Sequence, residues 1–289
     1  MEYKMICVLG PTASGKTRYA VELAKRVGGE IISADSRQVY RGMDIGTGKD
    51  LSEYGEIKYH LIDIVDAGEK YDIFRYKRDF IRAYEDIVAR GKYPILCGGS
   101  GLYIETVTRD YHLQEVPPNL KLREALEKED MDTLVTKLAS LKKLHNTTDY
   151  DTKKRVIRAI EIAMYQSEHV DYKESSDTIP FELKDVKFIG ISVTPQVRNE
   201  RIDKRLEARL KEGMVDEVRY LMNEKGLTAE NLIYYGLEYK FITQYLIGEL
   251  EYDVMVDKLR IAIHQFAKRQ MTWFRGMERK GIQIEWLEL

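Results

Sequence analysis

Eight consecutive residues near the start of the chain have the types and spacing of a phosphate-binding loop. Residues 10–17 read Gly-Pro-Thr-Ala-Ser-Gly-Lys-Thr, a complete G-x-x-x-x-G-K-T pattern. The glycines let the backbone curl so that successive N–H groups point at one anion, Lys16 adds a positive charge, and the Thr17 hydroxyl can bind Mg²⁺. The pattern predicts a polyphosphate site and leaves the identity of the phosphate ester open.

The segments that flank this loop have the patterns that the prediction needs. Residues 5–9 form an apolar run typical of a buried strand, and residues 18–27 continue as a helical pattern. A phosphate bound between them also meets the positive N-terminal end of the helix. A glycine turn without a ligand would explain the loop alone, but it fits this strand and helix context poorly.

A carboxylate follows the second expected strand, at residues 30–33. The strand leads into Ala34-Asp35-Ser36-Arg37-Gln38. Because ligands of parallel α/β sheets bind beyond the carboxyl ends of the strands, we expect Asp35 to share a cleft with Lys16. A simpler interpretation is that Asp35 caps a short helix over residues 36–41. We favour a chemical role because of the strand-end position.

Two further segments are expected near this cleft. The glycine-rich residues 42–48 are predicted to line it, and residues 59–64 are predicted to form a strand. Asp63 in that strand resembles the Mg²⁺-directing carboxylate of nucleoside triphosphatases. The segment therefore supports a second hypothesis, a small-molecule kinase that uses ATP, with Asp35 as the base for a hydroxyl acceptor.

Later segments predict two more contributions to an anion site. Residues 94–97 form an expected strand that opens into Gly98-Gly99-Ser100-Gly101, which is either a second anion-facing edge or a plain tight turn. A helix over residues 196–213 carries Arg201, Arg205 and Arg209 as a basic ridge. That ridge either pairs with neighbouring acids or extends an arm to a phosphate.

Composition limits the class of protein. The 289 residues are 44% hydrophobic and 33% charged, and no apolar run approaches the ~20 residues that a membrane helix needs. We therefore expect no membrane span. Cys7 and Cys97 lie in expected buried strands without metal-ligand spacing, which predicts core residues without a disulfide in a reducing compartment. The first residues lead directly into the phosphate-loop strand, so we expect a cytoplasmic protein.

Net charge gives no global argument for nucleic acid, because it is only −2. The basic residues are nevertheless clustered: Lys153, Lys154, Arg155 and Arg158 form one group, and residues 258–280 contain seven Lys or Arg against the single acid Glu278. Solvated helix faces explain most runs of this kind, so these clusters alone support an RNA-binding face only modestly.

The pattern of alternating strands and helices stops near residue 111. Amphipathic helices follow Pro117-Pro118, which is typical of an insertion, and strand chemistry returns at residues 187–193. The sequence predicts a P-loop core of residues 1–111 and 150–289, an α/β fold with a parallel sheet. The expected helical insertion is residues 112–149, with a far limit near residue 186.

Several of these stretches, taken together, closely resemble the tRNA dimethylallyltransferases, the prenyltransferases that modify the adenosine beside the anticodon. The stretches are residues 10–17, 34–47, 98–103, 154–159, 201–205 and 267–274. The phosphate loop is shared with many enzymes. The stretch around Asp35, together with Ala-Lys-Arg-Gln-Met-Thr-Trp-Phe at 267–274, is characteristic of this family.

The resemblance implies that the loop binds dimethylallyl diphosphate with Mg²⁺ and that the acceptor is an adenosine in the anticodon stem-loop of tRNA. It implies Asp35 as the general base, with Thr17 and Arg205 serving the diphosphate and Thr17 holding the metal. Diphosphate contacts are expected from Gly10, Thr12, Ala13, Ser14, Gly15, Lys16, Thr17, Ser100 and Arg205. Contacts to tRNA are expected from Asp35, Ser36, Arg37, Gln38, Lys154, Arg155, Arg158, Tyr239, Lys240, Lys268 and Arg269.

The chain departs from the family pattern at three places. Glu238 replaces a usual Gly before Tyr239-Lys240, Ile263-His264 replaces a usual Thr-Arg, and Pro195 stands where Arg is frequent. These departures concern the expected tRNA side more than the diphosphate side. A prenyltransferase that acts on free adenine nucleotides is a further alternative, and a monomer is the expected oligomeric state.

Overall fold

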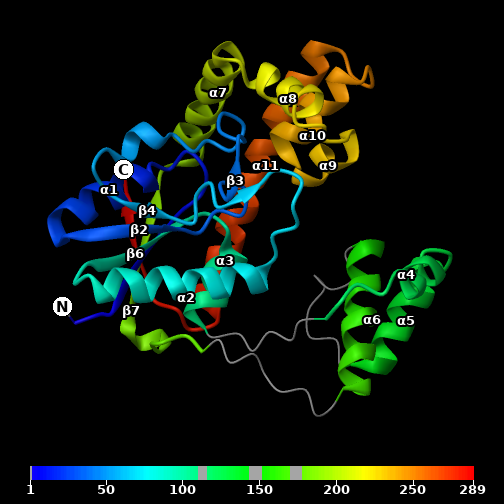
Figure 1. Cartoon of the computed structure of the whole chain (residues 1–289), viewed down its shortest axis with the longest axis horizontal. Coiled ribbons are helices and arrows are strands. Elements are labelled where there is room, and N and C mark those ends of the chain that lie inside the picture. The colour runs from blue at the N-terminus through cyan, green and yellow to red at the C-terminus, as the bar shows by residue number, and fades with distance from the viewer. Residues whose placement is uncertain (1, 110–115, 143–151, 170–177) are drawn as a thin grey trace. The chain divides into compact units, whose positions relative to one another are not determined.

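The computed structural model describes residues 2–109, 116–142, 152–169 and 178–289 (Figure 1). The chain divides into two compact units, which we describe separately. The core unit comprises Met1–Tyr111 and Asp177–Leu289, and the helical unit comprises His112–Ser176. The insertion edges predicted at residues 111/112 and 149/150 lie outside the described residues, and the helical unit ends before the far limit near residue 186.

The core unit contains both strands and helices, and five consecutive helices follow its strand β7. Its strands are β1 (Met5–Leu9), β2 (Gly29–Ser33), β3 (Tyr40–Arg41), β4 (Tyr59–His60), β5 (Val65–Asp66), β6 (Tyr93–Gly98), β7 (Val186–Ser192) and β8 (Ile284–Glu288). Its helices are α1 (Lys16–Val27), α2 (Ile73–Ala89), α3 (Gly101–Thr108), α7 (Pro195–Glu212), α8 (Met214–Asn223), α9 (Ala229–Tyr235), α10 (Leu237–Leu246) and α11 (Tyr252–Arg279). Short 3₁₀ helices cover Leu51–Tyr54 and Leu183–Asp185.

Six strands form one parallel sheet in the order β4-β2-β6-β1-β7-β8. The phosphate-loop strand β1 pairs with β6 on one side and with β7 on the other. A central strand is buried on both faces, which explains its continuous apolar sequence. The sheet confirms the predicted α/β class with a P-loop-like parallel core.

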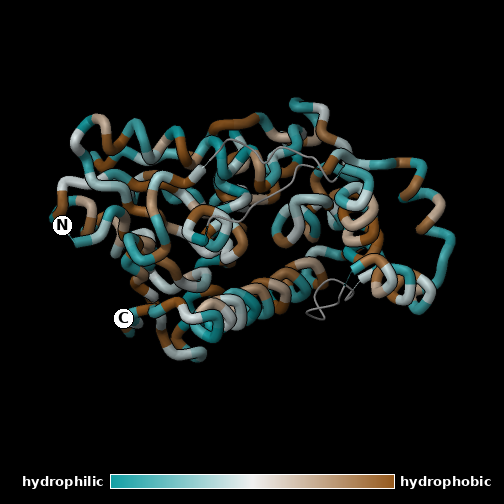
Figure 2. The backbone as a smooth tube through the Cα atoms, turned by 90° about the horizontal axis from the view of Figure 1, so that it is seen from below, coloured by the Kyte–Doolittle hydropathy of each residue, from teal (hydrophilic) through white to brown (hydrophobic). Residues whose placement is uncertain are grey.

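Successive residues of β1 point to opposite faces of the sheet, and each face has its own hydrophobic cluster. Ile6 and Val8 pack with Ala20 and Leu23 of α1. The alternate residues Met5, Cys7 and Leu9 belong to a larger cluster on the other face, with side chains of α2, α3 and α11. Figure 2 shows how hydrophobic and hydrophilic positions are distributed along the backbone tube.

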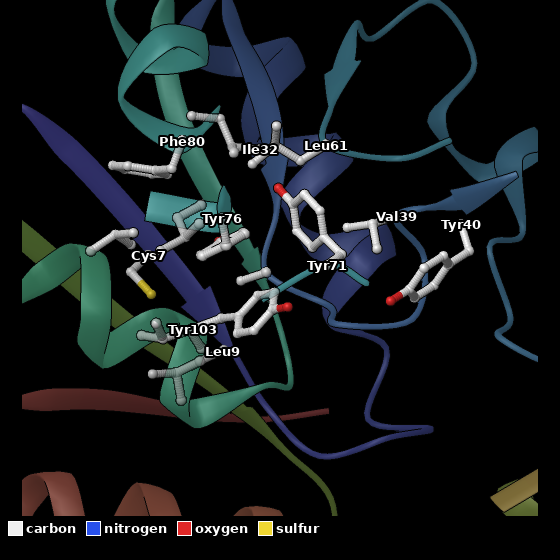
Figure 3. Packing of buried hydrophobic residues seen from close by; sticks show 14 of the residues in the cluster. Cys7, Leu9, Ile32, Val39, Tyr40, Leu61, Tyr71, Tyr76, Phe80 and Tyr103 are labelled. Atoms are coloured by element: carbon white, nitrogen blue, oxygen red, sulfur yellow. The ribbon is translucent and has the colours of Figure 1, made fainter. Parts of the chain in front are cut away.

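Aromatic residues dominate part of the larger cluster (Figure 3). Tyr76 and Tyr103 stack with ring centroids 4.0 Å apart, and Phe80 lies 6.4 Å from Tyr76. The buried Tyr76 hydroxyl donates to the Ser33 carbonyl at 3.2 Å. This bond ties helix α2 to the end of β2, directly before the Asp35 segment.

The helical unit contains α4 (Leu120–Leu126), α5 (Met131–Leu141) and α6 (Lys153–Glu168). Their apolar stripes form a separate small core that includes Leu126, Leu134, Leu138 and Ile160. Asn119 and Asp130 cap α4 and α5 by accepting backbone N–H bonds, as their positions before apolar periodic runs indicate. Residues 153–168 therefore group with the helical unit, although the narrower prediction placed them in the core.

Two local predictions are wrong. The strand expected at residues 59–64 ends at His60, because Leu61 and Asp63 have φ values of 62° and 55°, in the left-handed region. The helix expected at residues 36–41 is instead a series of turns that ends in β3. Strand β8 closes the sheet beside β7.

None of the helices in the described ranges combines the length and apolar character that a membrane crossing requires.

Candidate active site

The phosphate loop connects β1 to α1 in the geometry that its glycines predict. Gly15 has φ 91° and Ala13 has φ 61°, so the backbone turns sharply before the first residue of α1. Gly10 has no space for a side chain, because a Cβ would lie 2.5 Å from the Ile191 carbonyl oxygen. The Ser14 N–H donates to the Pro11 carbonyl at 3.3 Å. The loop therefore closes on itself at the N-terminus of α1.

A cavity of about 110 Å³ opens directly over this loop. It is lined by Thr12, Ala13, Gly15, Lys16, Thr17, Asp35, Gln38, Thr47, Gly48, Asp50, Glu53, Tyr54, Cys97, Gly98 and Arg205. The loop, the end of β2, the glycine-rich segment and helix α7 thus meet at one place. The predicted lining by residues 42–48 is confirmed for Thr47 and Gly48.

Asp35 reaches this cavity because β2 ends at Ser33, beside the phosphate loop. One carboxylate oxygen, Oδ1, accepts the Arg37 backbone N–H at 3.0 Å. This is a local turn contact of the kind that the capping interpretation anticipated, although no helix follows. The bond fixes the direction of the side chain, and Asp35 lines the cavity together with Lys16.

Two cations of the cavity are partly stripped of water. Burial lowers the pKa of Lys16, and the neighbouring thiol of Cys97 and carboxylate of Asp35 oppose that shift. Burial and the nearby Arg209 lower the pKa of Arg205 to about 10. A charged group with a depressed pKa gains stability from an anionic partner. These two cations therefore favour a negatively charged ligand beside the loop.

The arginines of α7 do not form the surface ridge that their spacing suggested. Arg201 is exposed, whereas Arg205 donates to the Thr12 hydroxyl and Arg209 is buried. The Arg209 guanidinium donates to Asp50 Oδ2 at 3.1 Å. The alternative that the helix carries an arm to a phosphate is the one that fits Arg205.

Oxygen ligands for Mg²⁺ are available beside the loop. Thr17, Asp50 and Glu53 line the cavity. Burial and the adjacent Asp50 raise the pKa of Glu53, and a divalent cation would relieve that repulsion between carboxylates. Across the described residues, no three or more His, Cys, Asp or Glu side chains form a metal-binding group. The oxygen atoms of Thr17, Asp50 and Glu53 fit Mg²⁺, because this ion takes few ligands from a protein and completes its coordination shell with phosphates and water.

Asp63, the metal carboxylate of the kinase hypothesis, lies elsewhere. It pairs with Lys49, whose side chain is 1% exposed and whose Nζ also donates to the Tyr40 carbonyl at 2.6 Å. Asp63 is not among the residues that line the cavity. Its role here is to neutralise a buried lysine, so the structure gives no support to the kinase assignment.

The Gly98-Gly99-Ser100-Gly101 turn joins β6 to α3 as predicted, but the hydroxyl of its serine is hydrogen-bonded to another part of the protein. Ser100 Oγ accepts the Ser36 backbone N–H at 3.1 Å, which links this turn to the Asp35 segment. Gln270 of α11 contacts the same turn and also the phosphate loop. Gly98 lines the cavity, whereas Ser100 is not among its lining residues.

Two family models match the chain. The model described as IPP transferase matches residues 38–277, and the model described as isopentenyl transferase matches residues 3–60. The chain is 55% identical over 291 residues to tRNA dimethylallyltransferase 1 of Parabacteroides distasonis, covering 99% of this chain and 92% of the relative. The chain belongs to the tRNA dimethylallyltransferase family.

Other relatives and solved structures agree with this family. tRNA dimethylallyltransferase 1 of Porphyromonas gingivalis is 54% identical over 288 residues, covering 98% of this chain and 93% of the relative. The full-length tRNA isopentenylpyrophosphate transferase of Bacillus halodurans has a TM-score of 0.71 at 31% identity, covering 99% and 90% of the two chains. A eukaryotic dimethylallyltransferase acting on tRNA has a TM-score of 0.77 at 28% identity, covering 99% and 74%. The chain is accordingly a prenyl-transferring enzyme.

Residues that the dimethylallyltransferase resemblance assigned to tRNA differ in their exposure. Lys268 and Arg269 are exposed on α11, and Lys240 is partly exposed on α10. Tyr239 is only 2% exposed, and its hydroxyl donates to Glu217 at 2.6 Å. Tyr239 is thus buried in this structure, and its side chain packs in the protein interior.

Glu217 organises the loop above Tyr239. Its carboxylate accepts the backbone N–H groups of Asp44, Ile45 and Gly46 at 2.7, 2.7 and 3.0 Å. A Cβ at Gly46 would lie 2.8 Å from the Tyr239 ring, so glycine is required for this approach. Glu217 therefore fixes the glycine-rich segment that lines the cavity, a role that no sequence pattern indicated.

The remaining residues predicted to bind tRNA fall into two groups. Ser36, Arg37 and Gln38 lie beside Asp35, where the Arg37 guanidinium is 5.8 and 5.6 Å from the ring centroids of Tyr234 and Tyr235. In the helical unit, Lys154 and Arg155 are exposed on α6. Arg158 pairs there with the buried Glu161 and donates to the Val116 carbonyl at 2.9 Å.

The three departures from the dimethylallyltransferase pattern have structural roles. Glu238 lines a small cavity with Arg205 and Arg209, and burial raises the pKa of its carboxyl. His264 Nε2 lies 2.8 Å from Asp203 Oδ1. Pro195 is the first residue of α7, a position where a missing N–H costs little.

The sequence missed several groups at this site. Asp50 and Glu53 line the cavity, and Glu238 lies beside Arg205 in a second, smaller cavity. Asp50 and Glu53 come shortly after the glycine-rich residues 42–48, and this closeness in sequence is the feature that could have placed them near the cleft. Glu238 was noticed only as a departure from the family pattern.

Proposed function

We propose that this enzyme transfers a dimethylallyl group from dimethylallyl diphosphate to the exocyclic N6 amine of the adenosine next to the anticodon in tRNA. The transfer releases diphosphate. The observation that carries this proposal is that Asp35 and the phosphate loop line one cavity. A proton acceptor and an anion site must be neighbours for the two halves of this reaction to occur together.

The donor half of the reaction needs a place for charge that develops on the leaving group. As the bond between C1 of the prenyl group and oxygen breaks, the bonding electrons move to the diphosphate. The loop amides, Lys16 and Arg205 are positioned to stabilise that charge, in a site that already lowers the pKa of both cations. Thr17 would hold Mg²⁺ beside the loop, and the ion would supply further charge neutralisation.

The acceptor half needs a base. The lone pair of the adenine N6 amine is delocalised into the ring, which makes the amine a poor nucleophile. Its nitrogen must lose a proton as the new bond to carbon forms. The Asp35 carboxylate lines the cavity and is the group of the site that we assign to take this proton.

An RNA acceptor requires that the adenine leave its stack. Removing a base costs a few kcal/mol and is least costly in a loop, which favours an anticodon loop over a helical stem. The exposed Lys268 and Arg269 and the basic side of α6 supply candidate phosphate contacts. We propose that a monomer is active. The buried, free thiols of Cys7 and Cys97 fit a reducing cytoplasm.

Labelled dimethylallyl diphosphate tests the proposal. The purified enzyme is incubated with Mg²⁺ and the labelled donor, together with unmodified tRNA or with free AMP as the acceptor. We expect label in the tRNA, on the adenosine beside the anticodon, and none in AMP. Label only in AMP would reject the RNA substrate, and label in neither acceptor would reject prenyl transfer. In a parallel assay with ATP in place of the prenyl donor, transfer of the γ-phosphate to a small-molecule hydroxyl would favour a kinase.

A further inference from the structure

The side chain of Gln270 connects two glycine-rich turns of the core unit. Its Oε1 accepts the Thr12 backbone N–H at 2.8 Å, and its Nε2 donates to the Gly99 carbonyl at 3.0 Å. Thr12 belongs to the phosphate loop, and Gly99 follows strand β6. The helix α11 is therefore attached to the loop by a residue 258 positions away in the sequence.

The direction of this amide follows from its partners. An N–H can only donate and a carbonyl can only accept, so the Gln270 oxygen must face Thr12 and the nitrogen must face Gly99. The side chain of Gln270 is 7% exposed. A buried amide with both ends bonded has one orientation, and removing it leaves two backbone groups to find other partners.

The residues around Gln270 pack closely against its side-chain amide. A Cβ at residue 99 would lie 2.3 Å from Gln270 Nε2, so any side chain there would displace the Gln270 amide. Thr12 is also held from its other side, because Arg205 donates to its hydroxyl. The backbone and the side chain of Thr12 are thus bound by two different helices.

We propose that Gln270 is a positioning residue that holds the phosphate loop in its anion-binding shape before the diphosphate arrives. The inference rests on the proposed function of the loop as the site of dimethylallyl diphosphate. Because Gln270 takes up the Thr12 N–H, the anion binds the amides farther along the loop. The fixed position of Thr12 orients those backbone N–H groups. A loop that already has its binding conformation loses less conformational entropy when the diphosphate binds.

Gln270→Met tests this role, because methionine has a similar length and can make neither hydrogen bond. We expect the Kd for inorganic diphosphate with Mg²⁺, measured by calorimetry, to rise roughly tenfold. The KM for dimethylallyl diphosphate should rise likewise, with a smaller change in kcat and a tRNA affinity within about twofold of wild type. Gln265→Met is the matched control, since Gln265 is exposed on the same helix.

Two results of the titration would overturn the proposal. A folded Gln270→Met enzyme that binds diphosphate as wild type does would show that the glutamine only packs the helix. A loss of tRNA affinity with unchanged diphosphate affinity would assign Gln270 to the acceptor. Wild-type enzyme that binds diphosphate but transfers nothing to tRNA would reject the proposed function and leave this inference intact.

A second measurement avoids the variant and any folding defect that it causes. Amide hydrogen exchange of ligand-free wild-type enzyme reports whether the Thr12 N–H is already bonded. We expect the Thr12 amide to be protected relative to open loop amides before any diphosphate is added. Exchange as fast as that of an exposed loop would overturn the preformed contact.

Discussion

The basic residues of the core unit fall into two groups that differ in burial and in partners. Lys16 and Arg205 line the cavity and Arg209 is buried behind Arg205, where Arg205 and Arg209 donate to Thr12 and Asp50. Lys268 and Arg269 stand exposed on α11. Desolvation lowers the pKa of Lys16 and Arg205, so these cations gain most when an anion fills the cavity.

The two groups of basic residues suit two different substrates, a small diphosphate and a large RNA. Buried, oriented cations act on one anion and lose much when any part is removed, because the rest of the arrangement is left unpaired. Exposed cations keep their water and contribute small, salt-screened increments to a large polyanion. We therefore expect substitutions in the cavity to act steeply on transfer and substitutions on α11 to act weakly on affinity.

Asp35→Asn should have the largest effect. The amide keeps the size of the carboxylate but cannot take a proton, so transfer should fall by about 10²–10⁴ in kcat. Single-turnover assays with labelled donor measure this, with tRNA and diphosphate affinities measured alongside. Retained turnover would reject the base assignment, and a matching loss of tRNA affinity would give Asp35 a binding role instead.

Arg205→Met should reduce transfer by about 10²–10³, because a donor aimed at the leaving diphosphate is removed. The loss should appear in kcat/KM for dimethylallyl diphosphate, with tRNA affinity unchanged. Arg201→Met is the matched control, since Arg201 is exposed one turn earlier on the same helix. Equal effects of the two substitutions would contradict the distinction between buried and exposed arginines.

The difference between buried and exposed charges should also affect the stability of the protein. The buried Glu30 pairs with Arg90 and lies 2.7 Å from His60. Bonds from Arg90 and His60 lower the pKa of Glu30 from 4.5 to about 2. Its contribution is therefore present above pH 4.5 and is lost as the pH falls towards 2. Allowing for the partly exposed Arg90, Glu30→Gln should lower the free energy of unfolding by about 2 kcal/mol near neutral pH.

Denaturant unfolding of wild type and Glu30→Gln over a range of pH measures this difference. The gap between the two should shrink as the pH falls below 4.5. Glu22→Gln breaks an exposed pair with Arg18 and should cost less than about 0.5 kcal/mol at any pH. A gap for Glu30→Gln that stays constant at low pH would show that charge is not its source.

Replacing Lys268 and Arg269 together by glutamine should have the smallest effect on the reaction. We expect roughly tenfold weaker tRNA binding, a salt dependence reduced by about two phosphate contacts, and unchanged diphosphate affinity. Lys25 and Arg26, an adjacent exposed pair on α1, give a control with the same charge change. Equal effects of both double variants would mean that net charge alone attracts the RNA.

Much of the diphosphate side could be predicted from the sequence, because its residues lie in short local patterns. The conformation of the loop at residues 10–17 and the position of Asp35 at the end of a strand both follow from the residues next to them in the sequence. Gln270 could not be given its role in this way, since its contact with Thr12 depends on how a distant helix packs. The same holds for Glu217, whose three bonds to residues 44–46 appear only once α8 is in place.

The errors in the sequence analysis have a related cause. Residues 59–64 have the composition of a strand, yet Asp63 turns towards the buried Lys49 and the chain leaves the sheet. Periodicity placed Arg205 and Arg209 on one edge of α7 correctly. It could not decide whether these arginines pair with acids or reach a phosphate, because Asp50, the partner of Arg209, comes from a distant segment.

A crystal structure with Mg²⁺ and a non-hydrolysable thio analogue of dimethylallyl diphosphate tests the central claim most directly. We predict the diphosphate on the loop amides, Lys16 and Arg205, with the reactive carbon of the prenyl group directed towards Asp35. A diphosphate bound away from the loop, or a prenyl group that points away from Asp35, would contradict the claim that one cavity serves both halves of the reaction.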